Sequence, residues 1–462
     1  MRLTTALGTY LRAGVFGKGT MSTGNLGIII LAAGKGERMK SRTPKALQPL
    51  GGTPMLGHVL ATARSLNPVK IIVVSGPNQV ESYVQGQFPG VAIAVQDPPR
   101  GTGDAVRCAG SHFDGFDGDI LILYGDVPLT SEVTLKALIE GHKGAAVSLI
   151  GMEAATPGKY GRLILAADGG VERIVEFADA TDKEKNITLC NSGILIADAG
   201  FLFEAIDGLK NDNSKKEYYL TDVISLARAA GKKVAVMRGR EQELSGVNSK
   251  SELAAAEAGL QKRLRAEAMD AGVTFLDPSS VYLSSDTKFG RDVTVWPHVV
   301  FGPGVMVEDG ATIHSFCHLE GARVKKGANV GPFARLRPGA DIGEGAKIGN
   351  FVEIKKAVIE AGAKVSHLTY IGDARVGQAA NIGAGVITCN YDGKNKHFTD
   401  IGAGAFIGSN VALIAPVKIG DGAVIGAGSV ITKDVTKDAL AVSRVAQKEI
   451  PGGAKKTGKG KS

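Results

Sequence analysis

Short aliphatic runs alternate with longer mixed segments through the first half of the chain. Four of these runs cover residues 28–31, 71–74, 91–95 and 120–123. Continuous aliphatic runs bounded by turn residues are typical of parallel strands buried on both faces. The segments between them, such as residues 54–66, have the length of crossover helices. The pattern predicts an α/β fold for residues 26–248, with a doubly wound, Rossmann-like sheet.

The next segment, residues 249–272, has the pattern of a helix. It is rich in alanine, and three leucines fall on one stripe. Ser249 or Ser251 can cap its amino end, and Gly272 can stop it. We expect a linker helix here, between two domains.

A six-residue repeat dominates the second half of the chain. An aliphatic residue or Phe recurs every six positions, and the register restarts after a few shorter steps and after one insertion near residues 389–398. The repeat positions are Val295, Phe301, Val307, Ile313, Leu319, Val324, Val330, Leu336, Ile342, Ile348, Ile354, Ile359, Val365, Ile371, Val376, Ile382, Ile401, Ile407, Leu413, Ile419, Ile425 and Ile431. Three such hexads make one triangular coil of a left-handed parallel β-helix, which we predict for residues 273–445.

A prism of this kind has little interior space. Its ligands must therefore bind on the outer surface or between neighbouring prisms. The polar residues on the outside decide between a catalytic domain and one that serves only as a scaffold or an oligomerisation module.

Charge is concentrated at the two ends of the chain. The net charge of +8 could indicate nucleic-acid binding, but residues 1–25 carry +3 and residues 446–462 carry +4, so the remaining residues carry only +1. Aromatic residues, at 5%, are too few for large stacking platforms. We expect no nucleic-acid partner, a disordered leader in residues 1–25 and a basic tail in residues 446–462.

The four cysteines lie far apart and form no CxxC pair. This argues against a zinc framework and against a small disulfide scaffold. No stretch reaches the roughly 20 apolar residues that span a bilayer. The sequence therefore favours a cytoplasmic protein with no membrane partner.

The loop after the first predicted strand is a candidate phosphate site. It contains a short Gly-x-Gly turn, Gly34 to Gly36, and is followed by Arg38 and Lys45. Backbone N–H groups at a strand-to-helix turn can bind phosphate, and the two cations could neutralise a polyphosphate. The loop matches neither the GxGxxG motif nor the P-loop, which argues against dinucleotide-binding and P-loop ATPase functions. An ordinary strand-to-helix turn is the alternative.

Asp126 follows the fourth predicted strand, at the carboxyl edge where α/β sheets bind ligands. A carboxylate in this place suits a Mg²⁺ ion that bridges phosphate oxygens. A turn or capping aspartate is the alternative.

Several segments resemble sugar-1-phosphate nucleotidyltransferases: LAAGKGERM from Leu31, PK at Pro44, QDPPRGTGDA from Gln96 and YGDVPL from Tyr124. Further segments at Tyr160, Val175, Asn191, Glu217 and Gly246 narrow the resemblance to one bacterial family. This is the family of bifunctional N-acetylglucosamine-1-phosphate uridyltransferase/glucosamine-1-phosphate acetyltransferases, and the resemblance extends from about residue 28 to residue 444. It implies that the sugar phosphate attacks the α-phosphorus of UTP and expels pyrophosphate, without a side-chain nucleophile.

The resemblance also assigns residues in the first domain. It gives the nucleotide and its phosphates to Leu31, Ala32, Ala33, Gly34, Arg38 and Lys45, and uracil and ribose to Gln96, Gly101 and Thr102. It gives the N-acetylated sugar to Gly161, Glu176 and Asn191, Mg²⁺ to Asp126 and Asn248, and further nucleotide or sugar contacts to Tyr124 and Gly125. Glu37 stands where the family usually has Thr, so we assign it no role and expect it to point outward.

Polar residues on the predicted β-helix suggest a second site. Arg337 and Lys355 are 18 residues apart, which stacks them on successive coils, and His367 follows in the next coil. Two cations and an imidazole on one surface suit a sugar phosphate and a general base. His314, Cys317 and His318 resemble a metal cluster only superficially, and we expect no metal there.

The same resemblance continues through HLTY from His367, NIGAG from Asn381, TCNYDG from Thr388 and SR at Ser443. It implies that His367 deprotonates the amine of glucosamine-1-phosphate, which then attacks acetyl-CoA. It gives the phosphate to Arg337 and Lys355, the sugar to Tyr370 and Asn381, and acetyl-CoA to Ala384, Asn390, Tyr391, Ser409, Ala427 and Arg444. It further implies a homotrimer with acetyltransferase sites between subunits.

The leading hypothesis is a cytoplasmic enzyme that acetylates glucosamine-1-phosphate and then couples N-acetylglucosamine-1-phosphate to UTP. Such an enzyme supplies UDP-N-acetylglucosamine for peptidoglycan and lipopolysaccharide. The alternative is a nucleotidyltransferase of one activity whose β-helix is a scaffold or a regulatory module. A nucleic-acid-binding protein is the third class, which the nearly neutral body of the chain disfavours.

Overall fold

The computed structural model describes residues 25–34 and 36–452 and divides the chain into two units. The first unit comprises the residues up to Gln48 together with 55–248, and the second comprises Pro49–Pro54 together with the chain from Ser249 onwards. The predicted leader, apart from Asn25, lies outside the described residues, as does the end of the predicted basic tail.

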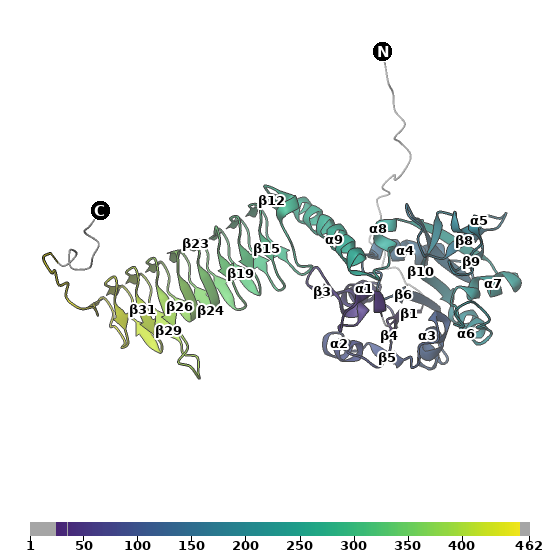
Figure 1. Cartoon of the computed structure of the whole chain (residues 1–462), viewed down its shortest axis with the longest axis horizontal. Helices are drawn as coiled ribbons and strands as arrows, with labels where there is room; N and C mark the ends of the chain where they lie inside the picture. Colours follow the sequence, from purple (N-terminus) through teal and green to yellow (C-terminus); the bar gives the residue numbers. More distant parts are fainter. Residues whose placement is uncertain (1–24, 35, 453–462) are drawn as a thin grey trace, which may run out of the picture. The chain divides into compact units, whose positions relative to one another are not determined.

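Within the described residues, a nine-stranded sheet forms the centre of the first unit (Figure 1). Its main path runs β11-β7-β10-β6-β1-β4-β5, and β8 and β9 extend from β10. The strands are β1 (Leu26–Leu31), β4 (Lys70–Ser75), β5 (Ala92–Val95), β6 (Asp119–Tyr124), β7 (Val147–Glu153), β8 (Arg162–Leu165), β9 (Val171–Val175), β10 (Leu189–Asp198) and β11 (Val234–Gly239). The four predicted strands are present and parallel. β10 runs antiparallel to β6 and β7, so the sheet is mixed, which the aliphatic runs did not indicate.

Helices cover both faces of this sheet, which confirms the doubly wound prediction. Ile28 and Ile30 of β1 belong to a core that includes α1, whereas Ile29 and Leu31 belong to a core that includes α3. The helices are α1 (Met55–Ser65), α2 (Val80–Gln87), α3 (Thr102–Ala109), α4 (Glu132–Gly141), α5 (Asp182–Lys185), α6 (Ala199–Asp207), α7 (Asp222–Ala229) and α8 (Glu241–Leu244), with the 3₁₀ turns η1 (Glu37–Met39), η2 (Lys45–Leu47) and η3 (Gly110–Phe113). This layering leaves the carboxyl ends of β1, β4, β5 and β6 at one edge of the sheet.

The second unit begins with the helix α9 (Lys250–Asp270). Ser249 caps it and forms a capping box with Glu252, so Ser249 is the cap of the two that the sequence allowed. A hairpin of β2 (Pro49–Leu50) and β3 (Thr53–Pro54) belongs to the same unit, because the backbone of Gly51 bonds Glu257 and Ser284. Residues 49–54 therefore fold with the second unit, although they lie within the range predicted for the first domain.

The rest of the second unit is the predicted parallel β-helix, with the 3₁₀ turn η4 (Pro278–Ser280) near its start. Its strands are β12 (Thr274–Phe275), β13 (Lys288–Phe289), β14 (Thr294–Val295), β15 (Val300–Phe301), β16 (Met306–Val307), β17 (Thr312–Ile313), β18 (His318–Leu319), β19 (Ala322–Val324), β20 (Asn329–Val330), β21 (Arg335–Leu336), β22 (Ala340–Ile342), β23 (Lys347–Asn350), β24 (Glu353–Ile359), β25 (Lys364–His367), β26 (Tyr370–Val376), β27 (Asn381–Ile382), β28 (Ile387–Cys389), β29 (Thr399–Ile401), β30 (Phe406–Ile407), β31 (Ala412–Ile414), β32 (Val417–Ile419), β33 (Val424–Ile425), β34 (Val430–Ile431) and β35 (Leu440–Ala441). Every predicted repeat residue is buried in one continuous core.

These strands form three faces of a prism. The first face is β12-β14-β17-β20-β23-β25-β27-β30-β33-β35. The second runs from β15 through β18, β21 and the starts of β24 and β26 to β28, β31 and β34. The third runs from β13 through β16, β19, β22 and the ends of β24 and β26 to β29 and β32. Ion pairs such as Arg323–Glu308 and Arg375–Asp400 cover this third face.

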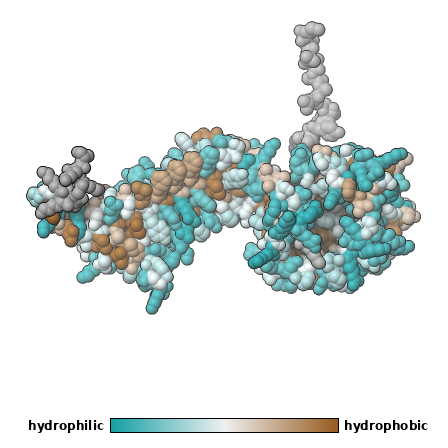
Figure 2. All heavy atoms as spheres, viewed as in Figure 1, coloured by the Kyte–Doolittle hydropathy of each residue, from teal (hydrophilic) through white to brown (hydrophobic). Residues whose placement is uncertain are grey.

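A column of exposed aromatic and aliphatic side chains follows the corner between the first and second faces. It consists of His298, Phe316, Phe333, Phe351 and Leu368, and we call it the corner column. Its rings stack with centroids 4.8–5.1 Å apart, and its residues have left-handed backbone angles with φ between 50° and 62°. Figure 2 shows hydrophobic side chains gathered on the β-helix, whereas the visible face of the α/β unit is mostly hydrophilic.

Candidate active sites

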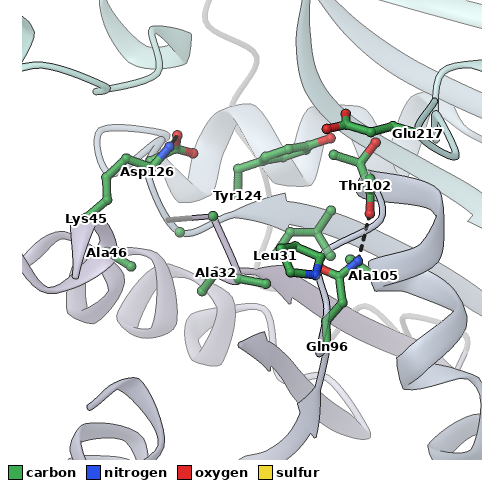
Figure 3. A pocket seen from close by; sticks show the side chains of 15 residues that line it. Leu31, Ala32, Lys45, Ala46, Gln96, Thr102, Ala105, Tyr124, Asp126 and Glu217 are labelled. Carbon is green, nitrogen blue, oxygen red and sulfur yellow. Dashed lines mark hydrogen bonds and ion pairs between the residues drawn. The ribbon is translucent and has the colours of Figure 1, made fainter. Parts of the chain in front are cut away.

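A cavity of about 460 Å³ opens at the carboxyl edge of the α/β sheet (Figure 3). Its walls come from segments that are far apart in the sequence but follow neighbouring strands. The predicted residues that line it are Leu31, Ala32, Ala33, Gly34, Lys45, Gln96, Gly101, Thr102, Tyr124, Gly125 and Asp126. The structure thus brings together most of the predicted nucleotide site.

Lys45 lies between two oxygen atoms at one end of this cavity. Its ammonium group contacts Asp126 Oδ2 and donates to Asn248 Oδ1 at 3.0 Å. Asn248 comes next to Asp126 because the N–H of Val247 donates to the Asp126 carbonyl at 2.8 Å. A carboxylate and an amide oxygen that converge on one cation fit Mg²⁺, which takes few protein ligands and completes its shell with phosphates and water. The two predicted metal ligands therefore form a suitable donor set.

The phosphate loop differs from its prediction in one respect. The chain after β1 continues into η1 and η2, and the first α-helix starts only at Met55, so no long helix begins at this loop among the described residues. Gly36 has φ 64°, and a Cβ atom there would lie 2.6 Å from Lys45 Cβ. The absence of a side chain at Gly36 therefore lets the loop pack against Lys45. Arg38 and Glu37 are exposed and line a hollow of about 280 Å³ beside Lys45.

The opposite wall contains a buried amide. Gln96, which is 4% exposed, donates to the Gly101 carbonyl and to Asp104, each at 2.9 Å. These bonds use both amide hydrogens, so the side chain can offer a ligand only its oxygen, as an acceptor. Gly101 has φ 112°, and a Cβ there would lie 2.5 Å from the Tyr218 carbonyl, so this close approach requires glycine.

A second group of predicted residues surrounds Tyr124. The ring lies against Gly193, and burial raises the pKa of the Tyr124 hydroxyl, with further contributions from Glu176 and Asp126. Burial likewise raises the pKa of Glu176, whose carboxylate accepts a hydrogen bond from Thr221 at 3.3 Å.

The two other predicted sugar residues lie in the same region. Asn191 donates its N–H to the Gly161 carbonyl at 2.8 Å. A Cβ on Gly161 would lie 3.6 Å from a Glu176 oxygen. The predicted sugar residues therefore meet around Tyr124.

Four of the predicted acetyltransferase residues fall on one column of the β-helix. His367, Ala384, Ser409 and Ala427 each lie two positions after a core aliphatic residue of the first face, and those core residues pair from coil to coil. Backbone bonds connect the coils at this level, such as the N–H of Asn410 to the Ala384 carbonyl at 2.7 Å. The small residues of this column therefore continue directly from the exposed His367 toward the carboxyl end.

The predicted phosphate ligands lie on the second face. Arg337 follows β21, and Lys355 stacks on it one coil later, as the spacing predicted. Arg337 donates to Glu353 at 2.7 Å, and the neighbouring ammonium of Lys396 lowers the pKa of Lys355. Tyr370 lies in the same stack, because it pairs with Glu353. This face therefore concentrates positive charge beside a tyrosine.

His367 does not share a sheet with these cations, which differs from the expectation of one surface. It ends β25 on the first face, where Asn381 also lies in β27. The corner residue Leu368 separates the two groups along the chain. The reason is that the chain turns a corner between His367 and Tyr370, which spacing alone does not reveal.

The remaining predicted acetyl-CoA residues lie toward the carboxyl end. Asn390 is buried and bonds Asp373, whereas Tyr391 is 59% exposed in the inserted loop. Asp392 orders this loop by accepting from the N–H groups of Asn395 and Lys394 and from His397, which lowers its pKa. Arg444 donates to the Ala427 carbonyl at 2.5 Å, which joins it to the histidine column.

The superficial metal cluster has ordinary roles in the fold. His314 bonds Asn329 at 3.1 Å, and burial raises the pKa of Cys317 to about 11. His318 is exposed on the second face. The described part of the chain holds no group of three or more His, Cys, Asp or Glu side chains that could bind a metal ion.

Four side chains at these sites had no assigned role in the sequence. Glu217 lines the α/β cavity, Glu353 pairs with Arg337, Lys396 lies beside Lys355, and Asn350 bonds His367. Coil counting could have found Asn350, because it stands 17 residues before His367 on the same face. Glu217 and Lys396 lie in irregular segments, where no period gives their position.

Each helix in residues 25–34 and 36–452 is too short or too polar to cross a bilayer.

Comparison with known proteins adds two kinds of similarity. Residues 28–184 match the family model of the MobA-like NTP transferase domain, and residues 398–433 match that of the bacterial transferase hexapeptide, six repeats long. The whole chain is also similar to proteins named "Bifunctional protein GlmU". It is 54% identical to that of Paramagnetospirillum magneticum, over 94% of this chain and 97% of that protein. It is 51% identical to the protein of Paracoccus denitrificans, over 92% of this chain and 95% of that protein. It is 50% identical to the protein of Jannaschia sp., over 93% of this chain and 95% of that protein.

Proposed function

The chain belongs to the family of bifunctional GlmU proteins, and from this premise we propose that it makes UDP-N-acetylglucosamine with two active sites, one on each unit. The β-helix site acetylates glucosamine-1-phosphate with acetyl-CoA. The α/β site then couples N-acetylglucosamine-1-phosphate to UTP and releases pyrophosphate. The observation that carries the proposal is the column of His367 and small residues on the β-helix, with cations on the adjoining face. A prism that served only as a scaffold would not need these groups.

In the acetyltransferase site, His367 accepts a proton from the ammonium group of the sugar. The free amine attacks the thioester carbonyl carbon of acetyl-CoA, the C–S bond breaks, and CoA leaves as the thiol after taking up a proton. An imidazole suits this step, because its ordinary pKa lies near neutral pH. Arg337 and Lys355 hold the phosphate, and Tyr370 and Asn381 hold the sugar. Ala384, Asn390, Tyr391, Ser409, Ala427 and Arg444 form the acetyl-CoA site.

In the uridyltransferase site, a phosphate oxygen of the sugar phosphate attacks the α-phosphorus of UTP, and the bond to pyrophosphate breaks. The residues supply positioning and positive charge rather than a nucleophile. Gln96 orients the base, Arg38 and Lys45 bind the phosphates, and Glu176 and Asn191 orient the sugar. Asp126 and Asn248 would hold Mg²⁺, which supplies charge neutralisation of the phosphate oxygens when bound.

Two observations support a homotrimer built through the β-helix, which we also propose. One is the corner column, whose apolar side chains are exposed by 45–62% from Phe316 to Leu368 and keep an unfavourable left-handed backbone. The other is the division of the acetyltransferase residues between two faces of one prism. A neighbouring prism that covers the corner column would bring a second face toward His367 and complete the site.

The two substrates UTP and acetyl-CoA, together with four free cysteines, favour the cytoplasm as the working compartment.

The test is to incubate the full chain with glucosamine-1-phosphate, acetyl-CoA, UTP and Mg²⁺, and to follow free CoA and pyrophosphate. We expect both products to appear, with CoA first. Release of pyrophosphate only when N-acetylglucosamine-1-phosphate is supplied would instead support the nucleotidyltransferase of one activity.

A further inference from the structure

We propose that Asn350 is a positioning residue for the acetyltransferase base: it holds His367 in the orientation and tautomer in which Nε2 accepts the proton. The inference rests on the proposed role of His367 and adds the group that fixes the direction of the imidazole.

The contact is a direct hydrogen bond. His367 Nδ1 lies 2.7 Å from Asn350 Oδ1. An amide oxygen only accepts hydrogen bonds, so Nδ1 must carry the proton and donate it. In a neutral imidazole the other nitrogen, Nε2, then has the free lone pair. Asn350 therefore selects the tautomer that a base needs.

The backbones of both residues are fixed by the stacked coils. Asn350 pairs with His367 in parallel register, and the N–H of Leu368 donates to the Asn350 carbonyl at 3.0 Å. A Cβ on Gly349 would lie 1.9 Å from the Ser366 carbonyl, so the close approach of the coils requires glycine before Asn350. With the backbone fixed, the His367 side chain can still rotate, and its hydrogen bond to the amide of Asn350 restricts this rotation.

A buried hydroxyl also fixes the backbone at His367. Thr369, which is 3% exposed, donates to the His367 carbonyl at 2.6 Å. The corner residues Phe351 and Leu368 follow Asn350 and His367 and point away from the core, exposed by 55% and 62%. The amide–imidazole pair therefore lies at the edge of the first face, beside the corner column.

The place of Asn350 in the column argues for positioning rather than contact with acetyl-CoA. It lies on the coil before His367, whereas the proposed acetyl-CoA residues lie on the coils after it. The side chain thus supports the imidazole from the side away from those residues.

A neutral partner also suits the chemistry of this base. A carboxylate in the same place would stabilise the imidazolium and make the base hold its proton more tightly. An amide orients the ring without adding charge. The pH–rate profile of acetyl transfer therefore tests the positioning role, because a purely structural role of residue 350 would leave that profile unchanged.

The experiment compares Asn350→Ala and Asn350→Asp in the full-length protein. We expect Asn350→Ala to lower kcat of acetyl transfer about 10- to 100-fold at unchanged KM, less than the roughly 10⁴-fold effect of the charged orienting residue in Ser-His-Asp triads. Asn350→Asp still accepts the Nδ1 proton, so it should recover activity. It should also move the acid limb of the pH–rate profile to higher pH.

Asn329→Ala is the matched control. It removes a comparable hydrogen bond, Asn329 to His314 at 3.1 Å, two coils nearer the amino end, and it should leave acetyl transfer unchanged. Uridyl transfer of every variant, measured in the same samples, reports on folding and should be unchanged. Asn350→Ala should have no further effect in the His367→Ala background, because its role is exerted through the imidazole.

The outcomes separate the inference from the proposed function. A wild-type kcat and pH profile in Asn350→Ala, or a parallel loss of both activities, would overturn the inference. A pH profile that Asn350→Asp leaves in place would do the same. Acetyl transfer that survives His367→Ala would instead overturn the proposed role of the base.

Discussion

The α/β unit and the β-helix build their candidate sites in different ways. In the α/β unit, loops from separate strands enclose a cavity of about 460 Å³ whose lining includes a lysine, two carboxylates and a side-chain amide of one chain. On the β-helix, His367 is exposed, and its proposed partners lie on two faces of the prism. One site is concave and contained in a single chain, whereas the other is the one that we propose a neighbouring chain completes.

The difference follows from the architecture of each unit. A twisted sheet with helices on both faces forms a crevice at the carboxyl ends of its strands. A β-helix fills its interior with aliphatic side chains, so a site with room for a substrate must lie outside. Assembly can therefore control the second site without affecting the first.

The largest expected effect comes from His367→Ala. Loss of a general base typically lowers a rate about 10²- to 10⁴-fold, and we expect acetyl transfer to fall within that range. Uridyl transfer should stay at the wild-type rate, because His367 and the cavity belong to different units. The assay is release of free CoA and of pyrophosphate by the same sample. A fall in both rates in a folded protein would contradict the independence of the two sites.

Asp126→Ala should give the opposite result. The substitution removes the carboxylate of the proposed metal site and leaves the Lys45 ammonium without its anionic partner. We expect uridyl transfer to fall about 10²- to 10³-fold and acetyl transfer to be unchanged. Binding of Mn²⁺ in the presence of UTP, measured by electron paramagnetic resonance, should weaken in parallel. An unchanged Mn²⁺ affinity would exclude Asp126 as a ligand.

A smaller effect is expected when the corner column is made polar. Asn tolerates a left-handed backbone, so Phe316→Asn with Phe333→Asn removes the exposed rings without adding strain. We expect the oligomer to dissociate in analytical ultracentrifugation and acetyl transfer to fall more than about tenfold, with uridyl transfer per chain retained. Val358→Asn, on the ion-paired third face, is the control and should change neither. Full acetyl transfer by a dissociated variant would show that one chain completes the second site.

The smallest effect concerns the pH dependence of stability. Burial raises the pKa of Glu176 in the folded state, so folding favours its protonated form. Its contribution to stability is therefore full below the unfolded pKa of about 4.3 and is lost as the pH rises through the folded pKa. Glu176→Gln lacks this loss, so its thermal midpoint should rise relative to wild type more at pH 8 than at pH 5.

Glu172→Gln is the control for that measurement, because Glu172 is exposed on β9, just before Glu176. Its midpoint, followed by differential scanning calorimetry, should track that of wild type at both pH values. If the thermal midpoint of Glu176→Gln exceeded that of wild type by the same amount at both pH values, ionisation of Glu176 would not destabilise the folded protein.

Most of the β-helix could be predicted from the sequence, because its geometry is periodic. A six-residue period determines which side chain enters the core, and coil counting placed Arg337 under Lys355 correctly. Counting did not reveal the corner between His367 and Tyr370, because corners depend on backbone angles such as the φ of 50° at Leu368. The partner Asn350 was within reach of the same counting.

The α/β site was less accessible to this kind of reasoning. The strands and the place of Asp126 at the sheet edge followed from the aliphatic runs, and the resemblance supplied Gln96 and Asn248. The position of Glu217 in the cavity wall and the antiparallel β10 depend on contacts between distant segments, which no local pattern encodes. The hairpin at Gly51 is a similar case, since it folds with a helix some 200 residues later.

The inserted loop after Cys389 has a consequence for how such a protein can change over time. Val376 pairs with Ile401 and Ile382 pairs with Ile407, 25 residues on in each case, so the extra residues leave the coils above and below in step. The prism also absorbs shorter steps, because Ile359 pairs with Val376 only 17 residues on and the next coil keeps its register. Natural variation in length is therefore expected in loops at the corners, while the aliphatic core positions of each coil stay in register.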